Sequence, residues 1–192
     1  MLRVVVLVSG SGTLLQSLID ATQDPSYGVE IVAVGSDRRK AYGLVRAQEA
    51  GIETFALPYR KGEDRAAWDR ELTARIAAHE PDVIVSAGFM KLVGEAFLDR
   101  FAGRMLNTHP ALLPSFPGMY GVRDALAYGV KVSGASLFVV DAGVDSGRII
   151  DQRTVRVHDD DTEETLHERI KVEEREMLVD HLRRRAAGEF VA

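Results

Sequence analysis

The chain has 192 residues, which fits one ordinary domain, and 46% of them are hydrophobic, which is enough for a full core. Lysine plus arginine number 24 and aspartate plus glutamate 29, so the formal net charge is -5. This balance argues against a broad nucleic-acid-binding surface, because such a surface requires a basic face. The sequence contains no cysteine, which excludes disulfides, thiolate nucleophiles and cysteine-ligated metal sites.

The N-terminal apolar run Val4–Val8 is about one strand long, and glycine follows at position 10. It lacks the longer apolar region and the small-residue cleavage site of a signal peptide. No stretch approaches the roughly 20 apolar residues that a membrane-spanning helix needs. We therefore expect a cytoplasmic protein that does not insert into a membrane.

Short apolar runs alternate with helical patterns along the first half of the chain. Buried strands are expected at Arg3–Val8, Ile31–Val34, Glu53–Ala56, Val83–Ser86 and Met105–Thr108. Helices are expected between them at Leu14–Ala21, Tyr42–Ala50, Asp64–His79 and Glu95–Phe101. Repeated strand–helix–strand units indicate right-handed crossovers and a mostly parallel sheet with helices on both faces.

The pattern changes after His109, where three prolines and Gly118 lie in one loop. A short helix is expected near Val122–Tyr128. Two further strands, expected at Ser136–Val140 and Ile149–Arg156, would extend the sheet as an antiparallel pair. A charged helix over 162–187, with position 161 or 162 as its N-cap, closes the chain. No linker or repeat interrupts this order, so we expect a single Rossmann-like α/β domain over residues 1–192.

The segment Ser9-Gly10-Ser11-Gly12-Thr13 lies between the first strand and the first helix. Glycines let the backbone approach a ligand closely, and the N–H groups at a helix N-terminus favour an anion. The pattern predicts a site for a phosphate of a mononucleotide type. NAD is an alternative, but a dinucleotide fold requires a glycine where Leu15 stands, and basic residues follow Asp37. A tight turn without a ligand is a third interpretation.

Asn107 and His109 lie at the C-terminal end of a predicted inner strand, which is where open α/β sheets bind ligands. Their spacing of two residues places both side chains on the same face. An amide can donate to a developing oxyanion, and an imidazole transfers protons near neutral pH. Asp145, in a glycine-flanked loop, can pair with His109 and stabilise its charged form. Taken alone, the same residues also fit a turn and a structural histidine.

No serine or cysteine nucleophile is evident near His109, which favours direct group transfer over a covalent intermediate. The remaining histidines show no metal-ligand spacing, and we expect surface or helix-capping positions for His79, His158, His167 and His181. The sequence therefore predicts no metal site.

Four motifs occur in the order that is typical of one family, namely Ser9–Thr13, Ser86–Met90, Leu106–Pro114 and Val140–Gly147. Through them the chain resembles the phosphoribosylglycinamide formyltransferases over nearly its whole length. The resemblance implies transfer of the formyl group of 10-formyltetrahydrofolate to the amine of glycinamide ribonucleotide. The products would be formylglycinamide ribonucleotide and tetrahydrofolate, in de novo purine biosynthesis, and no metal would be required.

The same resemblance implies roles for individual residues, with a nucleotide-binding half at 1–105 and a folate-binding half at 106–192. The catalytic residues would be Asn107, His109 and Asp145. The phosphate of the ribonucleotide would be bound by Ser11, Gly12, Thr13, Leu14 and Arg65. The amine side of that substrate would contact Pro110 and Glu174. The folate would be bound by Met90, Lys91, Leu92, Val93, Val140, Asp141 and Val144.

The chain departs from the family's pattern at positions around the cleft, namely Leu14, Tyr120, Phe138 and Arg148. These departures leave open a paralogous formyltransferase that acts on a different amine, such as an amino sugar or a specialised metabolite. A formyltetrahydrofolate hydrolase is disfavoured, since it usually carries an N-terminal regulatory domain. A transfer-RNA formyltransferase is also disfavoured, because it needs a basic surface. A non-catalytic nucleotide-binding module would retain the glycine loop and lose the three catalytic residues. The resemblance also leaves a homodimer open.

Overall fold

The computed structural model of the chain, described here for residues 1–189, contains one seven-stranded sheet with the order β3-β2-β1-β4-β5-β6-β7. The five parallel strands are β1 (Leu2–Val8), β2 (Val29–Ser36), β3 (Thr54–Ala56), β4 (Val83–Ser86) and β5 (Met105–His109). Two strands then run antiparallel to their neighbours, β6 (Val132–Val139) and β7 (Ile149–Arg156). The predicted fold class, a mostly parallel sheet with an antiparallel C-terminal extension, is confirmed.

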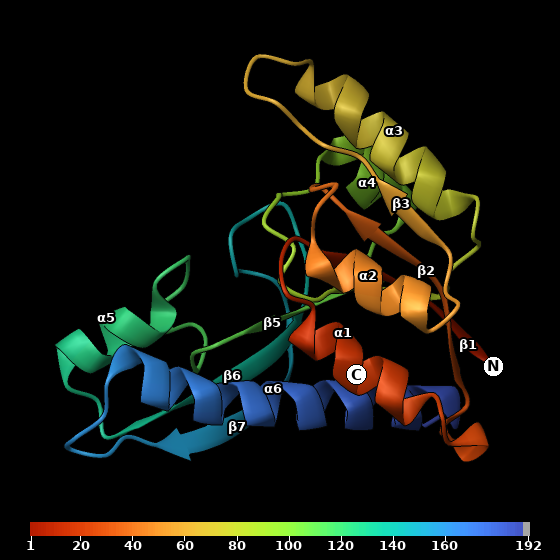
Figure 1. Cartoon of the computed structure of the whole chain (residues 1–192). Helices are drawn as coiled ribbons and strands as arrows, with labels where there is room; N and C mark the ends of the chain where they lie inside the picture. Colours follow the sequence, from red (N-terminus) through yellow and green to blue (C-terminus); the bar gives the residue numbers. More distant parts are fainter. Residues whose placement is uncertain (190–192) are drawn as a thin grey trace.

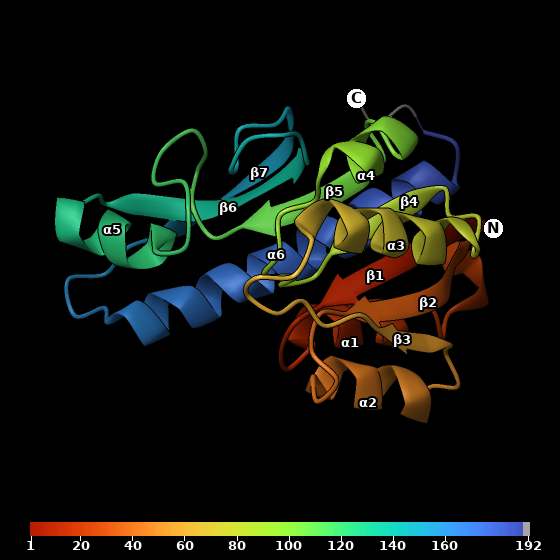
Figure 2. The ribbon, with the colours of Figure 1, turned by 90° about the horizontal axis from the view of Figure 1, so that it is seen from above.

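Within the described residues, six α-helices connect and cover the strands on both faces of the sheet (Figure 1, Figure 2). They are α1 (Thr13–Ala21), α2 (Tyr42–Glu49), α3 (Arg65–Ala77), α4 (Glu95–Arg100), α5 (Gly121–Tyr128) and α6 (Glu163–Ala186). None of these helices is long and apolar enough to cross a lipid bilayer. Asp64 caps α3 as predicted, since its carboxylate accepts the N–H of Ala67.

Two differences from the sequence-based expectations have physical reasons. The strand β6 begins at Val132, four residues before the predicted start, and its first residues include Ser133 and Gly134, which carry no apolar signal. Pairing with β7 over the whole length defines this strand. A 3₁₀ turn at Pro25–Tyr27 was not predicted, and its N-cap Asp24 accepts the N–H of Ser26.

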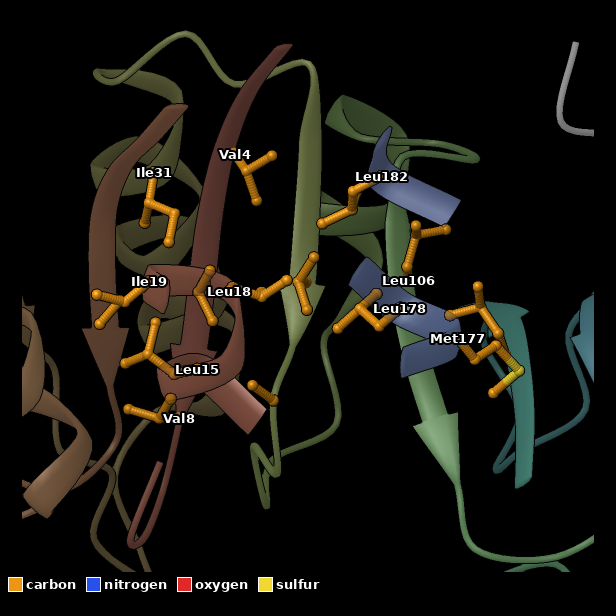
Figure 3. Packing of buried hydrophobic residues seen from close by; sticks show 14 of the residues in the cluster. Val4, Val8, Leu15, Leu18, Ile19, Ile31, Leu106, Met177, Leu178 and Leu182 are labelled. Atoms are coloured by element: carbon orange, nitrogen blue, oxygen red, sulfur yellow. The ribbon is translucent and has the colours of Figure 1, made fainter. Parts of the chain in front are cut away.

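The core lies in two layers because successive side chains of the buried strands point to opposite faces of the sheet. Val4 and Val8 of β1 face the layer formed by α1 and α6, where Leu18 and Leu178 pack between the helices and the sheet (Figure 3). On the other face, Leu7 belongs to the second cluster, to which α3, α4 and the C-cap of α4 contribute Trp68, Leu72, Ile76, Phe97 and Phe101. Burial on both faces explains why β1 is a continuous run of apolar residues.

The helix α6 lies beside α1 and runs along β6 and β7 (Figure 1). It begins with a capping box in which the side chains of Thr162 and Thr165 each accept the other's backbone N–H. Its buried face includes Glu174 and His181. The burial of His181 corrects the expectation of a surface position, because its helical spacing from Leu178 and Leu182 directs the ring into the core.

Candidate active site

His109 ends β5, and its side chain is buried between two acceptors. Its Nδ1 lies 3.4 Å from Oδ2 of Asp145, and its Nε2 lies 2.8 Å from the carbonyl oxygen of Phe116. A carbonyl oxygen can only accept, so Nε2 donates to it. Each ring nitrogen of His109 thus faces an oxygen that can accept a hydrogen bond. The predicted pairing of His109 with Asp145 is present in the structure.

Asp145 reaches His109 from the loop that follows β6. Its φ of 51° lies in the left-handed region, which is uncommon for a residue other than glycine and is frequent at functional sites. The loop is compact because the carboxylate of Asp141 accepts the N–H of Gly143 and the hydroxyl of Ser146. At Gly147 an added Cβ would lie 1.7 Å from the carbonyl oxygen of Val139, so this position requires glycine. The local turns therefore aim Asp145 at the histidine.

Asn107 lies two residues before His109 on β5 and is partly exposed. Its neighbours in the sheet are Ser86 of β4 and Phe138 of β6. The strand alternation places the amide and the imidazole on one face, as the spacing predicted. Phe138, one of the departures from the family's pattern, is buried directly opposite Asn107.

Glu174 projects from the buried side of α6 towards Thr108, the strand residue between Asn107 and His109. Burial raises the pKa of its carboxyl to about 7, an effect that a hydrogen bond from the Thr108 side chain partly offsets. Near neutral pH this carboxyl is therefore present in both its neutral and its ionised form.

The glycine loop leads directly into α1, with Gly12 as the N-cap at a φ of 70°. No side chain among residues 1–189 caps this helix, so its first N–H groups remain available to a ligand. An added Cβ at Gly12 would lie 2.6 Å from Cα of Gly43, which shows how closely α2 supports the loop. Arg46 of α2 adds a second support, since its Nε donates to the carbonyl of Ser11 at 2.8 Å.

The segment Met90–Val93 follows β4 and exposes the side chains of Met90 and Leu92, each at 62%. Arg65, predicted from the resemblance to contact a phosphate, donates instead to the carbonyl oxygen of Leu92. Its guanidinium also lies 4.8 Å from the ring centre of Tyr59 and 4.3 Å from that of Trp68. The contacts of Arg65 therefore connect it to the predicted folate segment, and its role towards the phosphate stays a prediction.

Sequence reasoning missed several groups that organise the site. Arg46 gave no signal because an arginine in a helix usually lies on a solvated face. Phe116 contributes only its carbonyl, which no side-chain pattern reveals. Asp37 entered only the comparison with dinucleotide folds, whereas in the structure its carboxylate accepts the hydroxyl of Ser9 at 2.5 Å. Its position at the end of β2, level with the glycine loop, was the available signal.

Comparison with known proteins gives the same picture. The sequence profile of the formyl transferases matches residues 2–182. The phosphoribosylglycinamide formyltransferase of Mycobacterium tuberculosis is 56% identical over 92% of this chain and 81% of its own length. The chain belongs to the phosphoribosylglycinamide formyltransferase family. Its counterpart in Escherichia coli is 40% identical over 90% of this chain and 82% of its own length.

The phosphoribosylglycinamide formyltransferase family also includes proteins of nearly the same three-dimensional structure. The crystal structure of glycinamide ribonucleotide transformylase 1 from Symbiobacterium toebii has a TM-score of 0.93 and 42% sequence identity. The match covers 98% of this chain and 89% of that one. The family resemblance predicted from four sequence motifs is thereby confirmed. Within residues 1–189, no three histidine, aspartate or glutamate side chains form a cluster suited to a metal ion.

Proposed function

We propose that this chain transfers the formyl group of 10-formyltetrahydrofolate to the amine of glycinamide ribonucleotide, which yields formylglycinamide ribonucleotide and tetrahydrofolate for purine biosynthesis. The observation that carries the proposal is the pairing of His109 with Asp145 at the end of β5, two residues from Asn107. It occurs in a chain that is 56% identical to a protein named for this activity. A paralogue acting on another amine is not favoured, because the relatives from Mycobacterium tuberculosis, Escherichia coli and Symbiobacterium toebii carry the glycinamide name.

The reaction begins when the lone pair of the substrate amine attacks the formyl carbon, and the carbonyl electrons move to its oxygen. Asn107 donates its amide N–H to this oxyanion, and His109 donates from Nε2. Asp145 supports the second donation, because an anion next to Nδ1 stabilises the imidazolium. The carbonyl of Phe116, which accepts the Nε2 proton in the structure, must give up this hydrogen bond as the formyl oxygen arrives.

The intermediate then collapses, the bond from the formyl carbon to N10 of the folate breaks, and its electron pair moves to N10. The proton lost by the attacking amine passes to N10, through a water ordered by Asp145. No nucleophilic side chain takes part, so no covalent enzyme intermediate forms. The step needs no metal ion, because Asn107 and His109 supply the stabilisation of the oxyanion.

The ribonucleotide would place its phosphate at the N-terminus of α1, on Ser11, Gly12, Thr13 and Leu14. The uncapped N–H groups of this helix and the positive end of its dipole support this assignment. Leu14 offers only its backbone there, so the backbone groups must carry the affinity at this position. The amine end would lie near Pro110 and Glu174, and the ionised form of Glu174 attracts a protonated amine before the reaction.

The folate would contact residues from both halves of the chain, namely Met90, Lys91, Leu92, Val93, Val140, Asp141 and Val144. The fit rests on the exposed apolar side chains of Met90, Leu92 and Val144, since such a patch favours an aromatic ring system. Cytoplasmic localisation remains a prediction from the sequence, and a homodimer remains a prediction of the family resemblance.

The test is an absorbance assay with 10-formyltetrahydrofolate and glycinamide ribonucleotide, run beside an amino sugar and a free amino acid amide as competing amines. Of the three amines, we expect only glycinamide ribonucleotide to be formylated. The Asn107→Ala variant should keep its fold and lose about 10²-fold or more in kcat. Turnover of another amine, without turnover of the ribonucleotide, would overturn the assignment.

A further inference from the structure

The segment Met90–Val93 connects β4 to α4 without the support of regular secondary structure. Within the described part of the chain, none of its backbone groups forms a hydrogen bond to another backbone group. Such a segment would ordinarily be mobile, because ordering each residue costs roughly 1–2 kcal/mol. It is instead held by side chains from other elements, which contact Met90, Leu92 and Gly94, the residue that follows the segment.

The first contact involves a buried carboxylate and a hydroxyl. Ser9 is the first residue of the glycine loop. Its hydroxyl donates to Oδ1 of Asp37 at 2.5 Å and accepts the N–H of Met90 at 2.8 Å. The Asp37 side chain is only 3% exposed, and the Lys91 ammonium lies 4.0 Å from its Oδ2. Because the hydroxyl donates to an oxygen of Asp37, its own oxygen is oriented to accept the N–H of Met90. Asp37 therefore acts on the segment through Ser9.

The second contact lies at the other end. Asp69 of α3 is buried, and its two carboxylate oxygens accept the N–H of Gly94 at 2.6 Å and of Phe97 at 3.1 Å. An added Cβ at Gly94 would lie 2.7 Å from Cγ of Asp69, so the carboxylate fits against a glycine. In the middle, the guanidinium of Arg65 donates to the carbonyl of Leu92.

We propose that Asp37 and Asp69 are positioning residues that hold Met90–Gly94 in a preformed conformation for the formyl donor. This inference rests on the proposed function, since that function assigns Met90–Val93 to the folate. Neither carboxylate touches the substrate in this scheme, and each acts through backbone N–H groups of the segment. A preformed segment loses less conformational entropy when the ligand binds, so the effect falls on affinity for the donor.

Four variants isolate the role of these carboxylates. Ser9→Ala removes the hydroxyl that accepts the N–H of Met90, and Asp37→Ala removes the carboxylate that orients this hydroxyl. Asp37→Asn retains an oxygen that can accept from Ser9. Asp69→Asn keeps one acceptor oxygen but presents an NH₂ group to the second backbone N–H. The matched control is Asp99→Asn, which removes an exposed carboxylate on α4.

The first measurement is amide hydrogen exchange of residues 88–97, followed by mass spectrometry on the intact folded chain. Asp37→Ala and Asp69→Asn should increase exchange in this peptide about tenfold, while exchange in β4 stays unchanged. Asp37→Asn and Asp99→Asn should match the wild type. Unchanged exchange in Asp37→Ala, Ser9→Ala and Asp69→Asn would overturn the inference, and no substrate is needed for this result.

The second measurement separates the two substrates kinetically. The KM for 10-formyltetrahydrofolate should rise about tenfold in Asp37→Ala, with kcat and the KM for the ribonucleotide changing less than about threefold. Asp37→Asn should restore the donor KM. An equal rise in both KM values, or no rescue by asparagine, would contradict a positioning role. If the wild type fails to use the ribonucleotide, the proposed function falls, and the exchange experiment still decides this inference.

Discussion

A single oxygen atom of Asp145 lies 3.4 Å from Nδ1 of His109 and also accepts the N–H of Gly118 at 2.8 Å. This atom therefore joins the loop that follows β6 to two consecutive segments, namely the end of β5 and the proline-containing loop after it. The carboxylate holds the imidazole in orientation and stabilises its charge at the same time. Changes to Asp145 should affect catalysis more than folding, because the side chain lies at the edge of the core.

The Asp145→Asn variant removes the negative charge and keeps the shape of the side chain. An amide lacks the negative charge that supports the His109 ring while this ring donates a hydrogen bond to the oxyanion. We expect kcat to fall by about 10²-fold or more, with an unchanged circular dichroism spectrum. Asp159→Asn, which alters a side chain that is 94% exposed, serves as the control. Near-normal turnover in Asp145→Asn would refute the proposed role.

Gly121 offers a test of the histidine from the opposite side. An added Cβ at this position would lie 2.9 Å from Nε2 of His109 and 3.0 Å from the carbonyl oxygen of Phe116. Gly121→Ala should therefore displace the imidazole and lower kcat by about tenfold or more, although alanine favours the helical conformation. Ala127→Ser, on the exposed side of the same helix, should leave kcat unchanged. Steady-state kinetics on both variants checks this, and equal kcat values would show that the ring tolerates the methyl group.

Much of the fold was predictable because the buried strands carry strong local signals. The apolar run of β1 and the limits of β4 and β7 follow from burial and alternation that the sequence pattern expresses directly. The start of β6 was not predictable, since Ser133 and Gly134 resemble a loop and only pairing with β7 makes them a strand. His181 was placed on the surface because a single histidine in a charged helix gives no sign of its neighbours.

The site, like the fold, has features that local sequence patterns predict and features that depend on tertiary contacts. The spacing of Asn107 and His109 predicted a shared face, because strand geometry determines it. The carbonyl of Phe116 and the pairing of Ser9 with Asp37 depend on tertiary contacts between segments 7 and 28 residues apart, which no local pattern encodes. Arg65 illustrates the remaining limit, since its contact with Leu92 forms only when α3 packs beside the segment after β4.

The buried His181 should make the stability of the protein sensitive to acid. Burial and the nearby cations Arg185 and Arg184 lower the pKa of its imidazole to about 4, against the opposing effect of Asp151 and Asp180. The folded state thus favours the neutral ring, so this stabilisation is present above pH 6.5 and is lost as the pH falls towards 4. His181→Leu should lose less stability than the wild type between pH 7 and about 5, as measured by Tm. Parallel Tm curves for the two proteins would contradict this.

Glu174 should produce the opposite dependence, because burial raises the pKa of its carboxyl from 4.5 to about 7. The unfolded chain ionises first as the pH rises, so the folded state loses stability between pH 4.5 and 7. Above pH 7 this loss is complete, and it is on the order of 3 kcal/mol. Glu174→Gln cannot ionise and should therefore gain stability relative to the wild type as the pH increases from about 5 to 8.

Urea unfolding of the Glu174→Gln variant and the wild type at several pH values measures this difference. The two proteins share every other titrating group, so the contributions of those groups cancel in the comparison. The same variant tests the function, since loss of the ionised carboxyl should raise the KM for glycinamide ribonucleotide by about tenfold. A constant stability difference across this pH range would show that the Glu174 carboxyl titrates normally, and an unchanged KM would remove it from the amine site.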